Sequence, residues 1–431
     1  MLGPAAVFLT ATATGLDILI THPGHAVLRL VLVLTAYAGF ALMLAVQRAQ
    51  PFLTRRLVLA ALLPLLGLAV AIPPHGSQDL WSYVMEGRTV SVHHHSPYRL
   101  APDQTGPDPL LARVAPRWRH QPAVYGPGFI AAAAVITRLA GTSPIALRLA
   151  FQVLAAAAAL ACVVVVGRKT GDPGAMAWLG LNPGLCLFVV NLGHNDLLVG
   201  AAVLIAILIA VERPAVAGAV VGLAALVKIV GLLALVALAV SVAGRVGRRA
   251  GATLAGVGVC VVAAGYALAG GTAAALPLRT ASQWHTPGSL AAASLALLPH
   301  INDVLVCQAL VAIAVVVLLV RGHAEPHWLV TAVVVAYLLG APYILPWYTA
   351  WALPAAALAW RSRLSLLIVV QSAALAVISV DNRTLAPNGL HIALSTATRT
   401  ILPALEILGL VVLMVTVLGR GRRREPTLST A

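Results

Sequence analysis

Most of the side chains that could do chemistry lie in one polar stretch, residues 75–125, between long apolar runs. Asp79 stands just past the preceding apolar run, at the start of a helix-like segment that also contains Tyr83 and Glu86. A carboxylate at a partly desolvated boundary can remove a proton from a hydroxyl group, provided that nearby cations balance its burial. Asp79 is therefore a candidate general base. Aspartate is equally suited to cap a helix N-terminus, and the loop alone leaves both roles open.

Cationic side chains form the second group of candidates, because they can bind phosphate and guanidinium groups do so in a bidentate way. Lys228 stands within an apolar run, where an ionisable residue is costly and functional by default. A place near a helix turn would let it snorkel, so phosphate contact and snorkelling stay open. Further phosphate candidates, each with solvent or lipid headgroups as the alternative partner, are Arg88, Arg99, Arg113, Arg117, Arg119 and Arg279.

Three smaller groups complete the candidates. The turn His194-Asn195-Asp196 suits either helix capping or substrate contact. The run His93-His94-His95 suggests metal binding by composition, but we favour solvated loop residues, since no spaced carboxylate partner is evident. No metal or cofactor is expected. Aromatic residues that could stack on sugar, or anchor the chain at the membrane interface, are Trp284 with His285 and Trp347 with Tyr348.

The high hydrophobic content of the sequence indicates that membrane-spanning segments position these residues. Of the 431 residues, 60% are hydrophobic and 10% are charged, whereas soluble proteins carry about 25% charge. A polytopic membrane protein follows, with too little polar chain for an independent soluble domain. The net charge of +15 is scattered between apolar runs, which argues against nucleic acid as a partner. The four cysteines lack CxxC spacing and predict neither a zinc site nor disulfides.

Hydropathy predicts an all-α bundle of about 13 transmembrane helices. The first run lacks a basic region and a cleavage site, so we expect a retained helix and no signal peptide. Residues 214–243 are expected to form two short helices that return to one side, and 126–140 a helix on the outer membrane surface. The apolar runs are 4–20, 27–46, 56–74, 145–166, 174–192, 197–211, 214–243, 251–271, 303–320, 327–342, 347–360, 364–380 and 400–419.

Arginine and lysine in the short loops set the orientation, because cytoplasmic loops hold the excess of both. The non-cytoplasmic face then receives residues 75–125, 193–196, 273–302 and 381–398, together with all histidines except His323 and His327. We therefore expect one transmembrane domain over 1–431 in the plasma membrane. An outer catalytic loop with a juxtamembrane helix would span 75–141, and a basic cytoplasmic tail would span 420–431.

A set of motifs gives the outer loop a recognisable order: Asp79, Trp81-Ser82-Tyr83, Gly87, Ser96-Pro97-Tyr98, Asp108-Pro109, Trp118 and Tyr125-Gly126-Pro127. Later motifs are Leu181-Asn182-Pro183, Gly193-His194-Asn195-Asp196, the segment 222–228, Pro346-Trp347-Tyr348 and the segment 351–354. In order and approximate spacing, these resemble the actinobacterial polyprenol-phosphate-mannose-dependent α-1,6-mannosyltransferases over about residues 56–360. The sequence departs at His93-His94-His95-Ser96, where relatives more often carry a short turn ending in Asn-Pro-Tyr or Asp-Pro-Tyr.

This resemblance implies a GT-C type glycosyltransferase whose catalytic aspartate, here Asp79, lies in the first large outer loop. It implies inverting transfer of mannose from β-linked polyprenyl phosphomannose to a cell-envelope glycan or glycolipid, forming α-1,6 links. One base suffices for inversion, because the lipid phosphate leaves already charged. The substrate-binding candidates are Tyr83, Glu86, Arg88, Tyr98, Trp118, Tyr125, His194, Asn195, Asp196, Lys228, Arg279, Trp284, His285, Trp347 and Tyr348.

Three alternatives belong to other classes. A lipid-linked sugar flippase or transporter would suit many helices and an intramembrane lysine, but transporter sites lie near the midplane in repeated halves, and no internal repeat is visible. A GT-C enzyme with another pentose or hexose donor would share the same loop. A glycan-binding scaffold without activity would have no need of Asp79.

Overall fold

The computed structural model describes residues 2–21, 25–290, 303–320, 325–380 and 389–420, and every regular element in these ranges is a helix. The all-α prediction is thereby confirmed. The predicted tail lies beyond the described residues from position 421 on. The helices of the first half are α1 Leu2–Leu19, α2 Ala26–Ala49, α3 Arg55–Ala71, α4 Asp79–Ser91, α5 Pro116–Arg119, α6 Pro127–Ala140, α7 Pro144–Thr170, α8 Pro173–Gly180 and α9 Asp196–Ile209.

The second half continues the bundle. Its helices are α10 Pro214–Val227, α11 Gly231–Arg245, α12 Arg248–Leu268, α13 Thr272–Ala281, α15 Asp303–Val320, α16 Pro326–Gly340, α17 Leu353–Ala357, α18 Arg363–Ser379 and α19 Gly389–Arg420. Within the described ranges, α1, α2, α7, α12 and most of α19 are long and apolar enough to cross a membrane, and shorter apolar helices accompany them. The chain is thus a polytopic membrane protein.

Proline breaks two of the predicted spans. Residues 174–192 form α8 and then a π-helical turn, Leu185–Val190, because Pro183 has no N–H to donate and disfavours the helical conformation of Asn182. Residues 347–360 likewise divide into a 3₁₀ helix, Pro346–Trp351, and the short α17. The expected pair of helices in 214–243 is confirmed as α10 and α11. Their junction is Lys228, whose backbone is extended.

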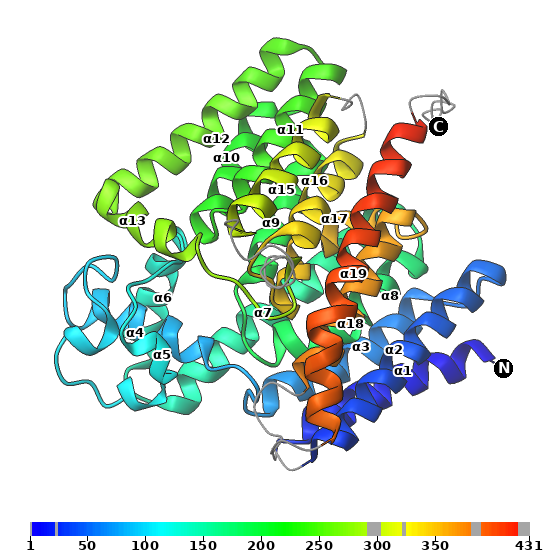
Figure 1. Ribbon diagram of the computed structural model, residues 1–431, viewed down its shortest axis with the longest axis horizontal. Helices are drawn as coiled ribbons and strands as arrows, with labels where there is room; N and C mark the ends of the chain where they lie inside the picture. Colours follow the sequence, from blue (N-terminus) through cyan, green and yellow to red (C-terminus); the bar gives the residue numbers. More distant parts are fainter. Residues whose placement is uncertain (1, 22–24, 291–302, 321–324, 381–388, 421–431) are drawn as a thin grey trace.

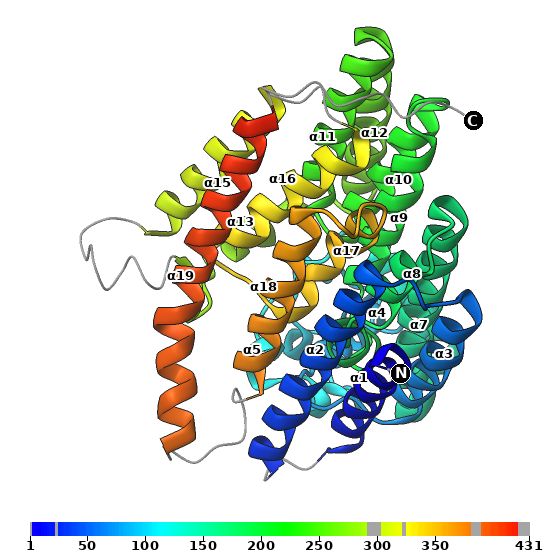
Figure 2. The same cartoon turned by 90° about the vertical axis from the view of Figure 1, so that its right-hand side faces the viewer.

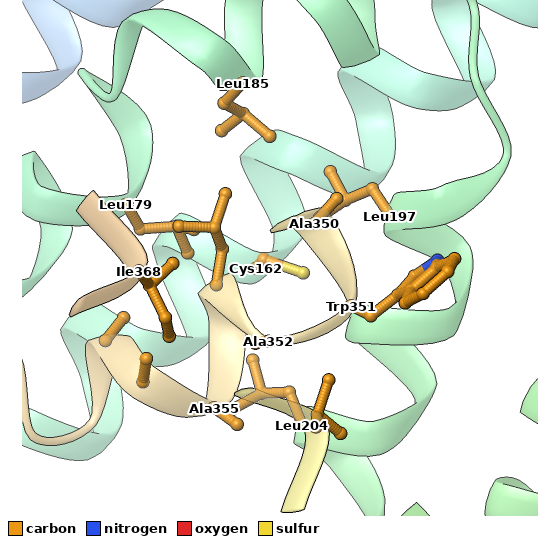
Figure 3. Packing of buried hydrophobic residues seen from close by; sticks show 14 of the residues in the cluster. Cys162, Leu179, Leu185, Leu197, Leu204, Ala350, Trp351, Ala352, Ala355 and Ile368 are labelled. Atoms are coloured by element: carbon orange, nitrogen blue, oxygen red, sulfur yellow. The ribbon is translucent and has the colours of Figure 1, made fainter. Parts of the chain in front are cut away.

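The helices divide into a bundle and a smaller lobe. Figure 1 shows α4, α5 and α6 in a lobe at the lower left, with α13 and α12 above it, while α1, α2 and α3 lie at the opposite end of the bundle. In Figure 2, α19 lies along the edge of the bundle next to α18. Buried apolar residues from the two halves of the chain pack together inside the bundle, as Leu197 of α9 does with Ala350 and Trp351 in Figure 3. The short segments around 182–196 and 343–352 are therefore enclosed by helices.

Two buried amides fix the point where the chain leaves the bundle for the lobe. The side-chain amide of Gln152 donates to the carbonyls of Ala69 and Ile72 at 2.9 and 3.1 Å, and that of Asn191 donates to the same carbonyls at 3.1 and 3.2 Å. The last carbonyls of a helix have no partner within it, so these amides satisfy the end of α3. Since Asp79 follows Ile72 by seven residues, the position of its carboxylate depends on this anchor.

Candidate active site

A pocket opens between the lobe and the bundle. Asp79 and Glu86 of α4 line it from one side, and Lys228 lines it from the junction of α10 and α11. The side chains come from five separate parts of the chain, which only the folded protein brings together. The lining consists of Asp79, Ser82, Glu86, Trp118, Gln121, Pro122, Val124, Tyr125, Lys228, Trp284, Tyr343, Leu345 and Tyr348.

Asp79 is the first residue of α4, and the capping position before it belongs to Gln78. The backbone N–H of Asp79 donates to the Ser77 hydroxyl at 3.2 Å, and the Gln78 side chain makes no capping bond. The first turn of a helix favours negative charge, because its N-terminal N–H groups carry a partial positive charge. The local structure therefore places the Asp79 carboxyl at the pocket wall, next to the partial positive charge of the helix N-terminus, and leaves the capping position to Gln78.

Glu86 is the second carboxyl of the pocket, two helical turns along the same face of α4. Its residue is 6% exposed, and its Oε2 atom is buried without a hydrogen-bond partner among the described residues. Burial raises the pKa of Glu86 well above its usual range, and the neighbouring Asp79 charge raises it further. A protonated Glu86 can donate a hydrogen bond to a ligand oxygen but cannot serve as a base.

Replacement of Glu86 by glutamine tests this protonation state. The folded protein keeps a proton that the unfolded chain loses above its ordinary pKa of 4.5, so the free energy of unfolding falls as the pH rises above that value. Glutamine does not titrate, so Glu86→Gln should abolish this fall in the free energy of unfolding, which amounts to at most about 1.4 kcal/mol per pH unit. We expect a higher unfolding temperature than the wild type at pH 8, and a flatter profile from pH 5 to 8. Parallel profiles would contradict a protonated Glu86.

Lys228 is held by a buried carboxylate and by aromatic rings. Its Nζ atom lies 2.7 Å from Oδ1 of Asp196, which is fully buried and also accepts a hydrogen bond from the Trp351 indole at 2.7 Å. The ammonium lies 4.5 Å from the ring centre of Tyr348 and 5.5 Å from that of Tyr125, within the range of cation–π attraction. These contacts fix the ammonium at the pocket wall, which argues against simple snorkelling.

A second layer of side chains supports the aromatic wall. The Tyr83 hydroxyl lies 3.0 Å from Nδ1 of His194, and the Tyr83 ring meets Tyr125 edge to face at 4.9 Å. The His194 ring stacks on Trp347 at 3.9 Å. Tyr83 and His194 are almost wholly buried, and neither lines the pocket. They set the orientation of Tyr125 and of the segment after Leu345, without access to a ligand.

The Tyr125-Gly126-Pro127 motif closes the lobe onto the bundle. The Gly126 N–H donates to the Val227 carbonyl at 3.0 Å. A Cβ atom on Gly126 would come 2.2 Å from the Leu226 carbonyl oxygen, so any larger residue would force the two segments apart. Because Lys228 follows directly, this contact sets the separation between Tyr125 and the ammonium.

Comparison with known families agrees with this geometry. The family described as alpha-(1->6)-mannopyranosyltransferase, N-terminal domain, matches residues 3–244, more than half of the chain and the part that contains Asp79, Glu86 and Lys228. The chain belongs to this family. It is therefore a glycosyltransferase, and more closely an α-1,6-mannosyltransferase. No curated protein and no solved structure matched it.

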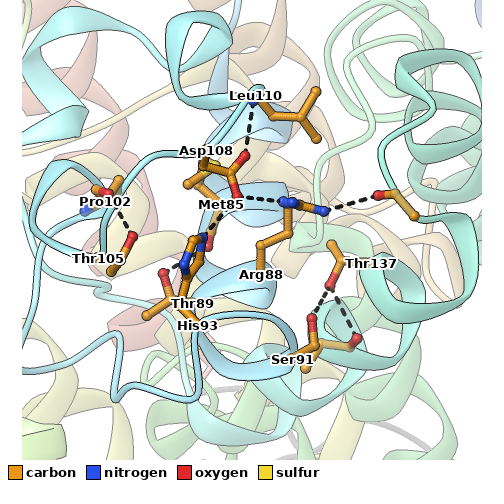
Figure 4. A network of polar contacts seen from close by, with 12 residues as sticks. Met85, Arg88, Thr89, Ser91, His93, Pro102, Thr105, Asp108, Leu110 and Thr137 are labelled. Carbon is orange, nitrogen blue, oxygen red and sulfur yellow. Dashed lines mark hydrogen bonds and ion pairs between the residues drawn. The ribbon is translucent and has the colours of Figure 1, made fainter.

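In this mannosyltransferase, one predicted phosphate ligand serves the fold instead. Nε of Arg88 lies 2.8 Å from Oδ2 of Asp108, and its Nη1 atom donates to the Gly141 carbonyl at 3.1 Å (Figure 4). Nε2 of His93 lies 2.9 Å from the same Asp108 oxygen. The expectation of solvated histidines is therefore wrong for His93, because a carboxylate distant in the sequence folds onto it. This buried network pins the loop to the end of α6.

Other predicted ligands of the mannosyltransferase also lie outside the pocket lining. Arg279 and His285 are exposed, and the buried Tyr98 donates its hydroxyl to the Tyr125 carbonyl at 2.9 Å. Asn195 is buried next to Asp196, the carboxylate that pairs with Lys228. Arg117 lies beside two aromatic residues of the pocket lining, with its guanidinium 4.7 Å from the ring centre of Trp118 and 5.7 Å from that of Trp284.

Three residues that contribute to the site were not among the substrate-binding residues predicted from the sequence. Trp351 holds Asp196, while Tyr343 and Gln121 line the pocket. Trp351 and Tyr343 flank the recognised Pro346-Trp347-Tyr348 motif, and that clustering of aromatics was the available signal. Gln121 carried none. Across the described residues, no three His, Cys, Asp or Glu side chains gather as a metal site would require.

Proposed function

We propose that this mannosyltransferase takes mannose from polyprenyl phosphomannose and transfers it to a hydroxyl group of a cell-envelope glycan or glycolipid. The observation that carries the proposal is the meeting of the Asp79 carboxylate and the Lys228 ammonium in one pocket of a membrane-embedded helical protein. A donor on a polyprenyl tail must enter from lipid, and its phosphate needs a cation at that level. The positive-inside pattern supports an outer-face site in the plasma membrane, where nucleotide sugars are absent.

In the proposed reaction, the oxygen of the acceptor hydroxyl attacks the anomeric carbon of the donor mannose, and Asp79 removes the proton of that hydroxyl. The bond from that carbon to the phosphate oxygen breaks, and the lipid phosphate leaves with the electron pair. Lys228 stabilises the charge on the leaving phosphate. Attack from the face opposite the phosphate converts a β-linked donor into an α-linked product.

The remaining lining residues have matching roles in this proposal. Protonated Glu86 donates a hydrogen bond to the sugar or the phosphate, and Trp118 with Trp284 offers ring faces to the mannose at the rim. The pairing of one carboxylate base with one fixed cation suits the GT-C type of glycosyltransferase. A transporter would use the same pocket without a base.

Donor choice tests the proposal. Purified protein in lipid nanodiscs receives a mannan oligosaccharide with either polyprenyl phosphomannose or GDP-mannose. We expect mannose transfer from the lipid donor alone, because the proposed outer-face site would meet lipid-linked sugars and not nucleotide sugars. An Asp79→Asn preparation, purified in parallel, measures any contaminating transferase. Efficient transfer from GDP-mannose, above that control, would refute the lipid donor.

A further inference from the structure

A second pocket lies beside the active site, between α18, α19 and the segments around residues 287 and 345. Leu345 lines both pockets, so one side chain forms part of the wall between them. The wall is held in place by Thr286, whose backbone N–H donates to Pro342 at 2.9 Å and whose hydroxyl accepts from the Ile344 N–H at 3.3 Å. The whole pocket lies beyond the segment that the family comparison matched.

Glu406 gives this pocket an unusual lining. It belongs to a membrane-spanning part of α19, its residue is 2% exposed, and it faces the pocket. The Leu290 backbone amide faces the carboxyl group without reaching hydrogen-bond geometry, and neither carboxylate oxygen has a partner among the described residues. A buried polar group without a partner is costly, and ionisable residues inside membranes usually have a functional partner. Glu406 can therefore accept hydrogen bonds from a ligand in this pocket.

The other lining residues narrow the class of ligand. Three residues with hydroxyl groups, Thr286, Ser379 and Ser395, also line the pocket, and Leu402 supplies apolar surface. Arg399 stands two turns from Glu406 on α19 and lines the pocket as well. A single carboxyl group beside an arginine lacks the several oxygen ligands that a divalent cation needs. Hydroxyls with apolar carbon faces, as in a sugar ring, match this lining.

We propose that this pocket binds a sugar ring of the acceptor glycan, with Glu406 accepting hydrogen bonds from the ring hydroxyls. The proposal rests on the proposed function and names a second contact of the same acceptor. One ring at Asp79 receives the new mannose, and a further ring of the same chain occupies the Glu406 pocket across Leu345. The enzyme therefore favours acceptors of several residues over a single mannoside.

Acceptor kinetics test this subsite. Wild type, Glu406→Leu and Glu212→Gln are assayed in nanodiscs with polyprenyl phosphomannose and with mannoside acceptors of one to four residues. Loss of one hydrogen bond typically weakens binding about two- to tenfold. Glu406→Leu keeps the length of the side chain but has no hydrogen-bonding atom, so it should raise the KM for the tetramannoside by about that factor, with the KM for the donor unchanged. Glu212 is exposed in the turn before α10, and its variant should match the wild type.

A second variant separates binding from folding. Ser395→Phe fills part of the same pocket and leaves Glu406 unchanged, and it should also raise the tetramannoside KM while the monomannoside KM stays constant. Thermal unfolding of each variant verifies that it is folded. If folded Glu406→Leu and Ser395→Phe both keep the wild-type tetramannoside KM, the subsite is refuted. Loss of transfer by the wild type itself would refute the proposed function instead, so the two failures are distinguishable.

Discussion

Asp79→Asn should abolish mannose transfer while leaving the fold intact. The amide keeps the size of the carboxylate and its ability to accept hydrogen bonds, but it cannot take the acceptor proton. Loss of a general base typically lowers the rate about 100- to 10,000-fold. Asparagine caps helices as well as aspartate does, so a capping role predicts retained activity. The measurement is the transfer rate from polyprenyl phosphomannose, together with the unfolding temperature in detergent.

Glu86→Gln is the matched control for that variant, because Glu86 lines the same pocket on the same face of α4. Its amide can still donate a hydrogen bond, so transfer should fall by less than about tenfold, below the usual contribution of a base. The reverse pattern, an inactive Glu86→Gln and an active Asp79→Asn, would assign the base to Glu86 and contradict the roles proposed for both residues.

Lys228→Met should cost both stability and activity, and a double variant separates the two. Removing the lysine leaves the fully buried Asp196 without its cation, which typically costs about 3 to 5 kcal/mol of stability. Lys228→Met combined with Asp196→Asn removes both charges and should recover most of that stability, since Asn can still accept the Trp351 hydrogen bond. Transfer by the double variant should stay about 100- to 1,000-fold below the wild type, because the cation for the leaving phosphate is missing.

Stability measures the structural role of Lys228, and the transfer rate of the folded double variant measures its role in the reaction. Chemical or thermal unfolding gives the structural cost, and saturating-donor kinetics on the folded double variant give the functional cost. Recovery of transfer together with stability would assign Lys228 to the fold alone and would remove it from the proposed phosphate site.

Local patterns in the sequence were sufficient for much of the fold. Long apolar runs predicted the helices, and the single lysine within 214–243 coincides with the break between α10 and α11. The prolines at 183 and 346 were visible too, but an apolar run does not reveal whether a proline will kink a span or divide it. That outcome depends on the neighbouring helices, because they decide whether the freed carbonyls find donors.

The candidate site was predicted less completely, for a related reason. Asp79 stands just past an apolar run and Lys228 stands within one, and the free-energy cost of a charged side chain in such a place is visible from the sequence alone. Whether an arginine faces a ligand or a protein carboxylate depends on contacts between distant residues. Arg88 meets Asp108 across twenty positions and Asp196 meets Trp351 across 155, and neither spacing follows from local periodicity.

The configuration of the product tests the central claim most directly. Wild-type protein is given β-linked polyprenyl phosphomannose and an oligomannoside acceptor, and the new glycosidic bond is determined by NMR. A single base acting opposite the leaving phosphate predicts an α-linked mannose, and membership of the α-1,6-mannosyltransferase family predicts attachment at the 6-hydroxyl. A β-linked product would require a covalent or double displacement and would contradict the role proposed here for Asp79.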